Sequence, residues 1–432
     1  MPYIKAGGHV KKSSNWQRNL YFLWVGNFMT GMGFSMTMPV ISLYVASLGH
    51  FTTSQLNLLS GFAFAITFLA KAIVSPYWGK LADQYGRKLM CLRASLGMTI
   101  TITACGFAPN VTILIILRAI QGCFSGYINN ANAIVAASVP IDRSGKALGT
   151  LATGNVVGTL VGPLLGGALA SSFGYRGSFF VAGAMMLVVF LMTMFFVHED
   201  FTPVDKVQLQ PMKQVFHTLK YPMLIWGLFI TTLVIQAANM SITPIISLLI
   251  KQLMHHGGQV AMVSGVISSL PGVVTLIFSP ILGSLSDHIG PEKVLGAGLV
   301  AAIVCFIPMS FAQNVWQLGV WRTLLGVSDA AMLPAIQTLM THYVPKDAFG
   351  RIFSYNQSFQ AMGSVGGPML GSVVANAFSY QGVFMMTAIL EGFNLIFLVP
   401  ATWALVKNGG TIREQQRAQA KQQQLAAKIV HN

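Results

Sequence analysis

Among the charged residues inside long apolar stretches of this sequence, four are considered first: Arg118, Arg322, Asp329 and Glu391. Because a charge inside an apolar membrane segment is costly, each is by default a candidate for function. Asp329 follows Arg322 two helical turns later, so both side chains would share one face of a helix. Asp329 could carry a proton or attract a cation, or it could form a structural ion pair with Arg322. Glu391 could be a functional acid, pair with a neighbour, or face lipid.

The motifs of common enzyme classes do not occur in the chain. PIDRSGKA, at 140–147, has the Gly-Lys pair of a phosphate-binding loop but lacks its leading glycine and the Ser or Thr after the lysine. There is no GxSxG or HExxH motif, and the four cysteines form no CxxC pair. We therefore expect no enzymatic activity, no ATP hydrolysis, no metal site and no cofactor.

The composition is that of a membrane protein. Charged residues make up only 9% of the chain and hydrophobic residues 54%, whereas a soluble protein carries about 25% charged residues. Apolar stretches of about 20 residues, the length that crosses a bilayer as a helix, recur throughout. The sequence therefore predicts an all-α integral membrane protein in contact with the lipid bilayer.

Polar clusters divide the sequence into twelve expected transmembrane helices. Their ranges are 20–46, 54–78, 89–108, 111–138, 145–171, 177–198, 221–250, 260–283, 293–312, 315–341, 348–376 and 380–405. Lysine and arginine concentrate in alternate connections and in both terminal segments, whereas the opposite connections contain only Arg176 and Lys251. The positive-inside rule therefore places both termini in the cytoplasm. The same asymmetry accounts for the net charge of +15, so nucleic acid is not an expected partner.

The second half of the sequence repeats the first after just over two hundred residues. MTMPVISLYV around Pro39 matches SITPIISLLI around Pro244, and LRAIQG at Arg118 matches WRTLLG at Arg322. The segments GTLVGPLLGG and GSVGGPMLGS also correspond. Two parallel copies are typical of transporters whose halves rock about a central site. We expect a six-helix bundle at 1–198, a cytoplasmic linker at 199–220, a second bundle at 221–406 and a cytoplasmic tail at 407–432.

Four motifs resemble signatures of one family. GKLADQYGRK, at 79–88, resembles the signature between the second and third helices of the major facilitator superfamily. Arg118, Gln121 and Gly122 resemble its fourth-helix R-x-x-Q-G element. GNVVGTLVGPLLGG, at 154–167, resembles the fifth-helix signature of its proton-coupled exporters, and MGFSMTMPVISLY, at 32–44, resembles the first-helix motif of its twelve-helix drug:proton antiporters. The resemblance covers nearly the whole chain.

This resemblance implies the major facilitator fold, with two pseudo-symmetric six-helix bundles. It also implies export of hydrophobic or amphipathic drugs from the cytoplasm in exchange for protons, by alternating access, with the proton gradient as the energy source. Proton coupling would involve Asp329, Arg322, Arg118 and Glu391.

The motifs also imply conformational roles. The loop after the second helix would be a latch that holds one conformation, formed by Gly79, Asp83, Gly86, Arg87 and Lys88. A weaker second copy keeps Asp287 but loses the arginine. The fifth helix would form a close seam with the other half, since small residues recur on one of its faces. The residues of that seam are Gly154, Gly158, Gly162, Pro163, Gly166 and Gly167.

The expected first, fourth and seventh helices contain no acid, although many exporters of this branch have one there. They offer amides, methionines and aromatic rings, which would suit adaptable amphipathic ligands or could simply serve packing. The expected cavity residues are Asn27, Met32, Phe34, Met36, Asn129, Asn132, Gln236 and Asn239. Lys71, in the second helix, would extend its stem toward the membrane surface.

Two alternatives remain open at this point. The same fold could serve a specific carrier for a metabolite, a sugar or a lipid. The chain could also be a membrane-embedded receptor or enzyme without flux, although a latch and a helix seam have no obvious use in a static site. We expect a monomer in the plasma membrane of a bacterium, and the substrate stays open.

Overall fold

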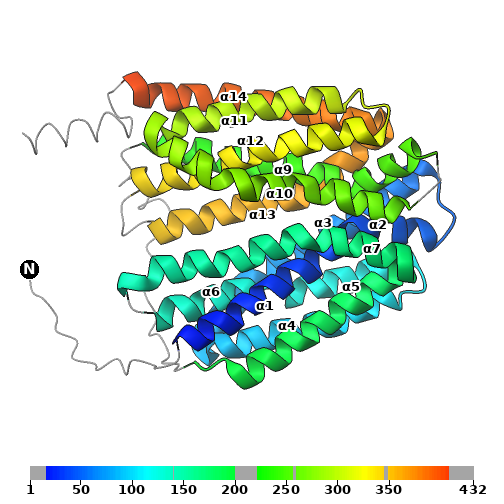
Figure 1. The fold of residues 1–432 in the computed structure, drawn as a ribbon, viewed down its shortest axis with the longest axis horizontal. Helices are drawn as coiled ribbons and strands as arrows, with labels where there is room; N and C mark the ends of the chain where they lie inside the picture. Colours follow the sequence, from blue (N-terminus) through cyan, green and yellow to red (C-terminus); the bar gives the residue numbers. More distant parts are fainter. Residues whose placement is uncertain (1–15, 140, 200–220, 256–258, 345–348, 408–432) are drawn as a thin grey trace, which may run out of the picture.

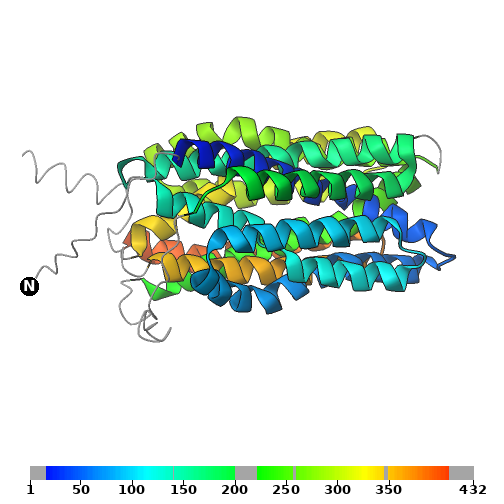
Figure 2. The same ribbon diagram turned by 90° about the horizontal axis from the view of Figure 1, so that it is seen from below.

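The computed structural model describes residues 16–139, 141–199, 221–255, 259–344 and 349–407. Every regular element in these ranges is a helix, and the helices run side by side along one direction (Figures 1 and 2). The first half contains α1 (Trp16–Met36), α2 (Met38–Ser47), α3 (Thr53–Tyr85), α4 (Arg87–Gly106), α5 (Val111–Phe124), α6 (Tyr127–Ser138) and α7 (Ile141–Phe196). The second half contains α9 (Pro222–Leu253), α10 (Val260–Ile289), α11 (Pro291–Met309), α12 (Val315–Tyr343), α13 (Phe349–Ala377) and α14 (Tyr380–Lys407).

The helices of the described ranges are consistent with twelve membrane crossings. Ten stretches are long and apolar enough to cross a membrane, and α1 with α2 and α5 with α6 each count as one of them. The stretch Ala147–Phe196 in α7 has 50 residues, too many for one crossing of about 20. Gly174 divides it with a non-helical φ of 74°. The remaining crossing is α13, whose 29 residues include more polar side chains.

Helix boundaries follow local chemistry that repeats between the halves. Asn110 caps α5 by accepting a hydrogen bond from the Ile113 amide at 2.9 Å. Asn314 caps α12 in the same way from the Gln317 amide at 2.9 Å. Side-chain caps of this kind satisfy amides at a helix start that have no intrahelical partner. The matching caps show that the sequence repeat is also a structural repeat.

Each half has its own hydrophobic core. The core of the first half consists of buried side chains between Leu23 and Val197, joined by Ala261 from α10. The core of the second half consists of buried side chains between Leu224 and Leu398. Figure 1 shows the two groups of helices side by side, with the start of α1 and the end of α14 at the same end of the molecule. The expected linker and tail, 199–220 and 407–432, lie almost entirely outside the described residues. Their boundaries stay predictions.

The halves contact each other through α3 with α13, α7 with α10 and α2 with α9. The Ser42 hydroxyl donates to the Pro244 carbonyl, and the Ser247 hydroxyl donates to the Pro39 carbonyl, both at 2.6 Å. Near the start of α3, the Asn57 amide donates to Asn376 at 3.2 Å. These hydrogen bonds between the halves lie toward the end opposite the start of α1.

Candidate functional site

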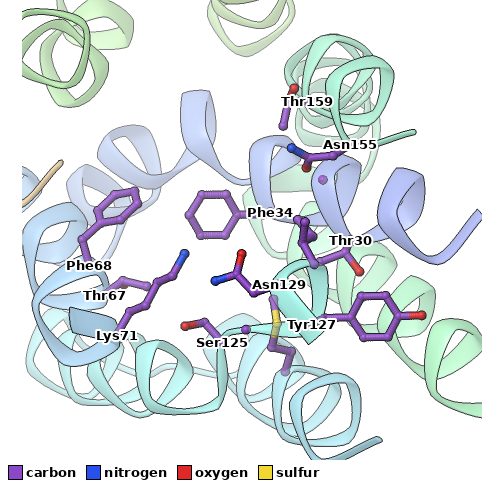
Figure 3. A pocket seen from close by; sticks show the side chains of 14 residues that line it. Thr30, Phe34, Thr67, Phe68, Lys71, Ser125, Tyr127, Asn129, Asn155 and Thr159 are labelled. Carbon is purple, nitrogen blue, oxygen red and sulfur yellow. The ribbon is translucent and has the colours of Figure 1, made fainter. Parts of the chain in front are cut away.

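A cavity of about 130 Å³ opens in the first half. Its walls come from α1, α3, α4, α7 and the junction of α5 with α6 (Figure 3). The rings of Phe34 and Phe68 form an apolar side, and Asn129 and Ser125 lie on a polar side. Lys71 extends between them, with its ammonium group near the middle of the cavity. The expectation that Lys71 reaches toward the membrane surface is therefore wrong.

The expected fourth transmembrane helix is broken in its middle. α5 ends at Phe124, Ser125 is extended, and Gly126 has a φ of 125° before α6 begins at Tyr127. Such a φ favours glycine, because other residues have a Cβ that clashes there. Broken helices inside a membrane expose backbone groups where a substrate or ion can bind. The break lies in the cavity wall, and the sequence analysis, which treated 111–138 as continuous, missed it.

Arg118 is buried among polar groups of its own half. It is 0% exposed and donates to the Ala63 carbonyl at 3.3 Å and to the Gln121 side chain at 2.9 Å. The Thr67 hydroxyl in turn donates to the Arg118 carbonyl at 3.1 Å. No described acid forms a salt bridge with this guanidinium. These contacts join α3 to α5 beside the cavity and leave a proton-coupling role for Arg118 as a prediction.

Asp329 lies in the second half, at the position that Ser125 occupies in the first. Its carboxylate accepts a hydrogen bond from the Asn239 amide of α9 at 3.2 Å. Within the described ranges no salt bridge of 4.0 Å or less connects Asp329 to Arg322. The Nε atom of Arg322 is buried without a hydrogen-bond partner among the described groups. The direct ion pair considered above is therefore not formed in this conformation.

Glu391 does not face lipid. It is 1% exposed, and its carboxylate accepts a hydrogen bond from Asn394 at 3.1 Å, one turn later on α14. One turn earlier, the Thr387 hydroxyl lies 3.3 Å from that of Ser241 on α9. The polar groups of α14 thus point into the second bundle.

The glycines of the expected fifth helix pack in a different direction from that predicted. A Cβ at Gly158 would lie 2.1 Å from the Phe28 carbonyl, and those at Gly154, Gly162 and Gly166 would also meet α1 of the same half. The copy in α13 repeats this, since a Cβ at Gly363 would lie 2.5 Å from the Leu233 carbonyl of α9.

The contact with the other half lies on the neighbouring face of α7. A Cβ at Gly167 would lie 2.4 Å from the Ala261 carbonyl, and one at Gly265 would lie 2.4 Å from the Pro163 carbonyl. Of the residues expected in the seam between the halves, Pro163 and Gly167 contact α10 of the other half, whereas Gly154, Gly158, Gly162 and Gly166 contact α1. Pro163 lies within the helix, and the non-helical position of α7 is Gly174, which falls between the expected spans 145–171 and 177–198.

With this geometry established, comparisons with known proteins show the family. The Major Facilitator Superfamily profile matches residues 23–270 and 228–429, which is more than half of the chain. The chain belongs to this superfamily. It is therefore a transporter and not an enzyme, and the expected fold class is confirmed.

Individual relatives agree with the profile. The chain is 48% identical to "Multidrug resistance protein MdtG" of Enterobacter lignolyticus, over 89% of the chain and 92% of that protein. It is 47% identical to the protein of the same name from Serratia proteamaculans, over 93% and 97%. A bacterial homologue of the human lysosomal transporter Spinster, in an inward-facing and unoccupied conformation, has the same fold. It gives a TM-score of 0.74 at 17% identity, over 91% of this chain and 98% of that one.

The superfamily's loop signature is held by a residue that the sequence analysis missed. The Glu199 carboxylate accepts hydrogen bonds from the Arg87 amide at 3.1 Å and from the Lys88 amide at 2.6 Å, at the start of α4. The Arg87 guanidinium donates to the Ala133 carbonyl at 3.0 Å, and the Lys88 ammonium donates to the Met194 carbonyl at 3.1 Å. The signature thus ties α4 to α6 and α7.

Other latch residues are only partly described. Gly86 has a φ of 92° between α3 and α4, and a Cβ at Gly79 would meet nothing within 4 Å. The side chains of Asp83 and Asp287 lie outside what the structure describes. Their latch role stays a prediction.

The transporter's expected cavity residues separate into three groups. Phe34 and Asn129 line the cavity, as predicted. Met32 packs against the core, Met36 is 1% exposed within it, and Asn27 is buried and donates to Asn132 at 3.5 Å. In the second half, Gln236 donates to Ser364 at 3.0 Å, and Asn239 contacts Asp329 as described. The cavity of the first half also includes Thr30, Thr67 and Asn155, which no motif or spacing in the sequence singles out.

Proposed function

We propose that this transporter exports hydrophobic and amphipathic drugs from the cytoplasm of a bacterium by proton antiport, with alternating access. The printed names of its relatives support the multidrug part of the proposal. The structure supports a central role for the cavity, because apolar rings and a few polar groups on its wall are typical of sites for small molecules.

Asp329 is the observation that carries the coupling step. A carboxylate inside the membrane domain is costly and is retained where it functions. This one has an amide partner on α9 and no salt bridge among the described residues, so protonation would not break an ion pair. Protonation removes its charge, and this would change the relative stability of the two conformations, since a neutral side chain is shielded from water at lower cost than a charged one. Substrate and proton would then compete through this group.

Alternating access is supported by the distribution of contacts between the halves. Hydrogen bonds of Ser42, Ser247 and Asn57 connect the halves toward the end opposite the start of α1 and the end of α14. With both termini in the cytoplasm, as proposed from the positive-inside rule, this contact region closes the outer side. Opening of the transporter to the outer side would require these hydrogen bonds to break.

The test is gradient-driven transport by the purified protein in sealed proteoliposomes with an acidic lumen. Wild type should accumulate ethidium, or a neutral drug such as chloramphenicol, while protons leave the lumen, as reported by an internal pH dye. Asp329→Asn keeps the shape and the amide contact but cannot titrate, so gradient-driven uptake should be lost. If Asp329→Asn kept full uptake and full proton movement, coupling through Asp329 would be refuted.

Transport assays in the same vesicles distinguish a multidrug exporter from a carrier that is specific for one substrate. A panel of cationic, neutral and anionic compounds, with sugars and a lipid analogue, would be offered to wild type. A multidrug exporter moves several unrelated members of the panel. Transport confined to one chemical class would favour the specific carrier instead.

A further inference from the structure

The cavity of the first half has a charge that its proposed drug-export role does not explain. Lys71 is the only charged side chain among its fourteen lining residues. No described residue accepts a hydrogen bond or salt bridge from its ammonium group. Figure 3 shows this group pointing between Phe34 and Asn129. The Lys71 side chain is exposed to this cavity, and a cation without a counter-ion there attracts an anion.

The backbone beside Lys71 also favours negative charge. α6 begins at Tyr127, inside the cavity wall, and its N-cap residue, Gly126, has no side chain to bond the first amides. The start of a helix carries a partial positive charge and free N–H groups, both of which stabilise anions.

A third group in the wall lacks a partner. The Thr30 hydroxyl is buried, 5% exposed, and forms no hydrogen bond with the described residues. Buried polar groups normally have a partner, but this oxygen has almost no accessible surface and points away from Lys71 and Asn129 (Figure 3), so it is not part of the site that Lys71 faces. Lys71 and the start of α6 together make the cavity a place for an acceptor-rich, negatively charged group.

The second half does not repeat this arrangement. Gly122 packs against the Thr67 carbonyl in the first half, and Gly326 packs against the Pro271 carbonyl in the second. These equivalent contacts show which residues of the two halves correspond. In this register Lys71 corresponds to Thr275, whose hydroxyl donates to the Gly326 carbonyl at 2.9 Å. The helix α12 is continuous where the first half breaks, and it carries Asp329 at the position of Ser125.

We propose that Lys71, Asn129 and the start of α6 form an anion-binding subsite, which takes the carboxylate or sulfonate of an amphipathic substrate. The apolar part of the same molecule lies against Phe34 and Phe68. The subsite sits in the half opposite Asp329, so the anion and the coupling proton bind to different bundles. This assignment rests on the proposed function only in treating the bound molecule as cargo.

The first test measures the charge of the cavity without any ligand. Cys123 is replaced by Ser, because Cys91, Cys105 and Cys305 are buried whereas Cys123 is partly exposed. Asn129→Cys then places a thiol in the cavity. Its labelling rates are measured with anionic sulfonatoethyl methanethiosulfonate and with the cationic trimethylammonioethyl analogue, which react by the same chemistry.

The anionic-to-cationic rate ratio should fall about 10-fold or more with Lys71→Met and should be kept by Lys71→Arg. Lys251→Met removes the same charge from the far end of α9 and should leave the ratio unchanged. An equal ratio with and without the Lys71 charge would overturn the proposal. So would a thiol that neither reagent reaches, because the subsite would then be closed to solutes.

The second test measures binding of naphthoate and naphthamide, which differ in charge but hardly in shape, to full-length protein in lipid nanodiscs. Wild type should bind naphthoate more tightly, and Lys71→Met should weaken naphthoate by about 10- to 100-fold while changing naphthamide much less. Equal affinities in wild type, or equal losses for both probes, would refute an anion subsite. The proposed antiport is judged separately, by wild-type drug uptake, so either idea can fail without the other.

Discussion

The Ser42 hydroxyl donates a hydrogen bond to the Pro244 carbonyl at 2.6 Å, across the boundary between the two halves. Ser247, its counterpart in the repeat, donates to the Pro39 carbonyl at the same distance. Ser42 thus donates to a carbonyl shortly before Ser247, and Ser247 donates to a carbonyl shortly before Ser42. A proline in a helix frees the carbonyl four residues earlier and not its own, so the Pro39 and Pro244 carbonyls accept the serine hydroxyls through a second lone pair. The repeat therefore produces a reciprocal clasp between α2 and α9.

Removing this clasp should shift the conformational equilibrium. Each hydrogen bond contributes about 0.5–1.5 kcal/mol, so Ser42→Ala with Ser247→Ala should favour the opposite conformation by about 10-fold or more. Electron-electron distance measurements between spin labels on the outer ends of α3 and α13 would detect the opening. Ser171→Ala, which removes an exposed bond within α7, is the control. Unchanged distance distributions in the double variant would contradict a clasp that stabilises this conformation.

Close packing of α7 on α1 predicts which glycines tolerate substitution. A Cβ at Gly158 would lie 2.1 Å from the Phe28 carbonyl, and backbone cannot move aside cheaply. Gly158→Ala should therefore lower stability by about 1–3 kcal/mol, seen as a lower thermal midpoint in detergent. Gly392→Ala, where a Cβ would meet nothing within 4 Å, should leave the midpoint unchanged. Equal midpoints for both variants would show that α1 and α7 are not in close contact.

The contact of Glu199 with α4 predicts a local stabilising role. Its carboxylate accepts both the Arg87 and Lys88 amides at the positive end of the helix. Glu199→Gln removes the charge and one of the two acceptors, which should cost about 1 kcal/mol. Faster hydrogen exchange at the first turn of α4, with the rest of the bundle unchanged, would report it. Gln55, an exposed capping residue of α3, offers the control substitution Gln55→Ala, which should act on α3 alone. Exchange at α4 that is the same in Glu199→Gln and wild type would contradict the contact.

Much of this fold could be predicted because its signals are local. Apolar length and polar clusters indicated the helix boundaries, and the repeat indicated the two halves. The break at Gly126 was missed because one Ser-Gly pair hardly changes the hydropathy of a span. Glu199 was missed because its partners lie over a hundred residues away. Periodicity identified the glycine face of α7 but could not say whether α1 or α10 covers it.

Glu391 gives the last prediction, because its burial leaves two roles to distinguish. Glu391→Gln keeps an acceptor for the Asn394 amide and removes the titratable group. If the role is structural, this variant should fold with an unchanged thermal midpoint and keep gradient-driven uptake. Glu391→Ala would leave that buried amide unpaired and should lose about 1–3 kcal/mol. A stable Glu391→Gln protein that binds drug but no longer moves protons would instead make Glu391 a coupling acid. In that case proton movement by Asp329→Asn and by Glu391→Gln would have to be compared, because both acids lie in the second bundle and either could carry the coupled proton.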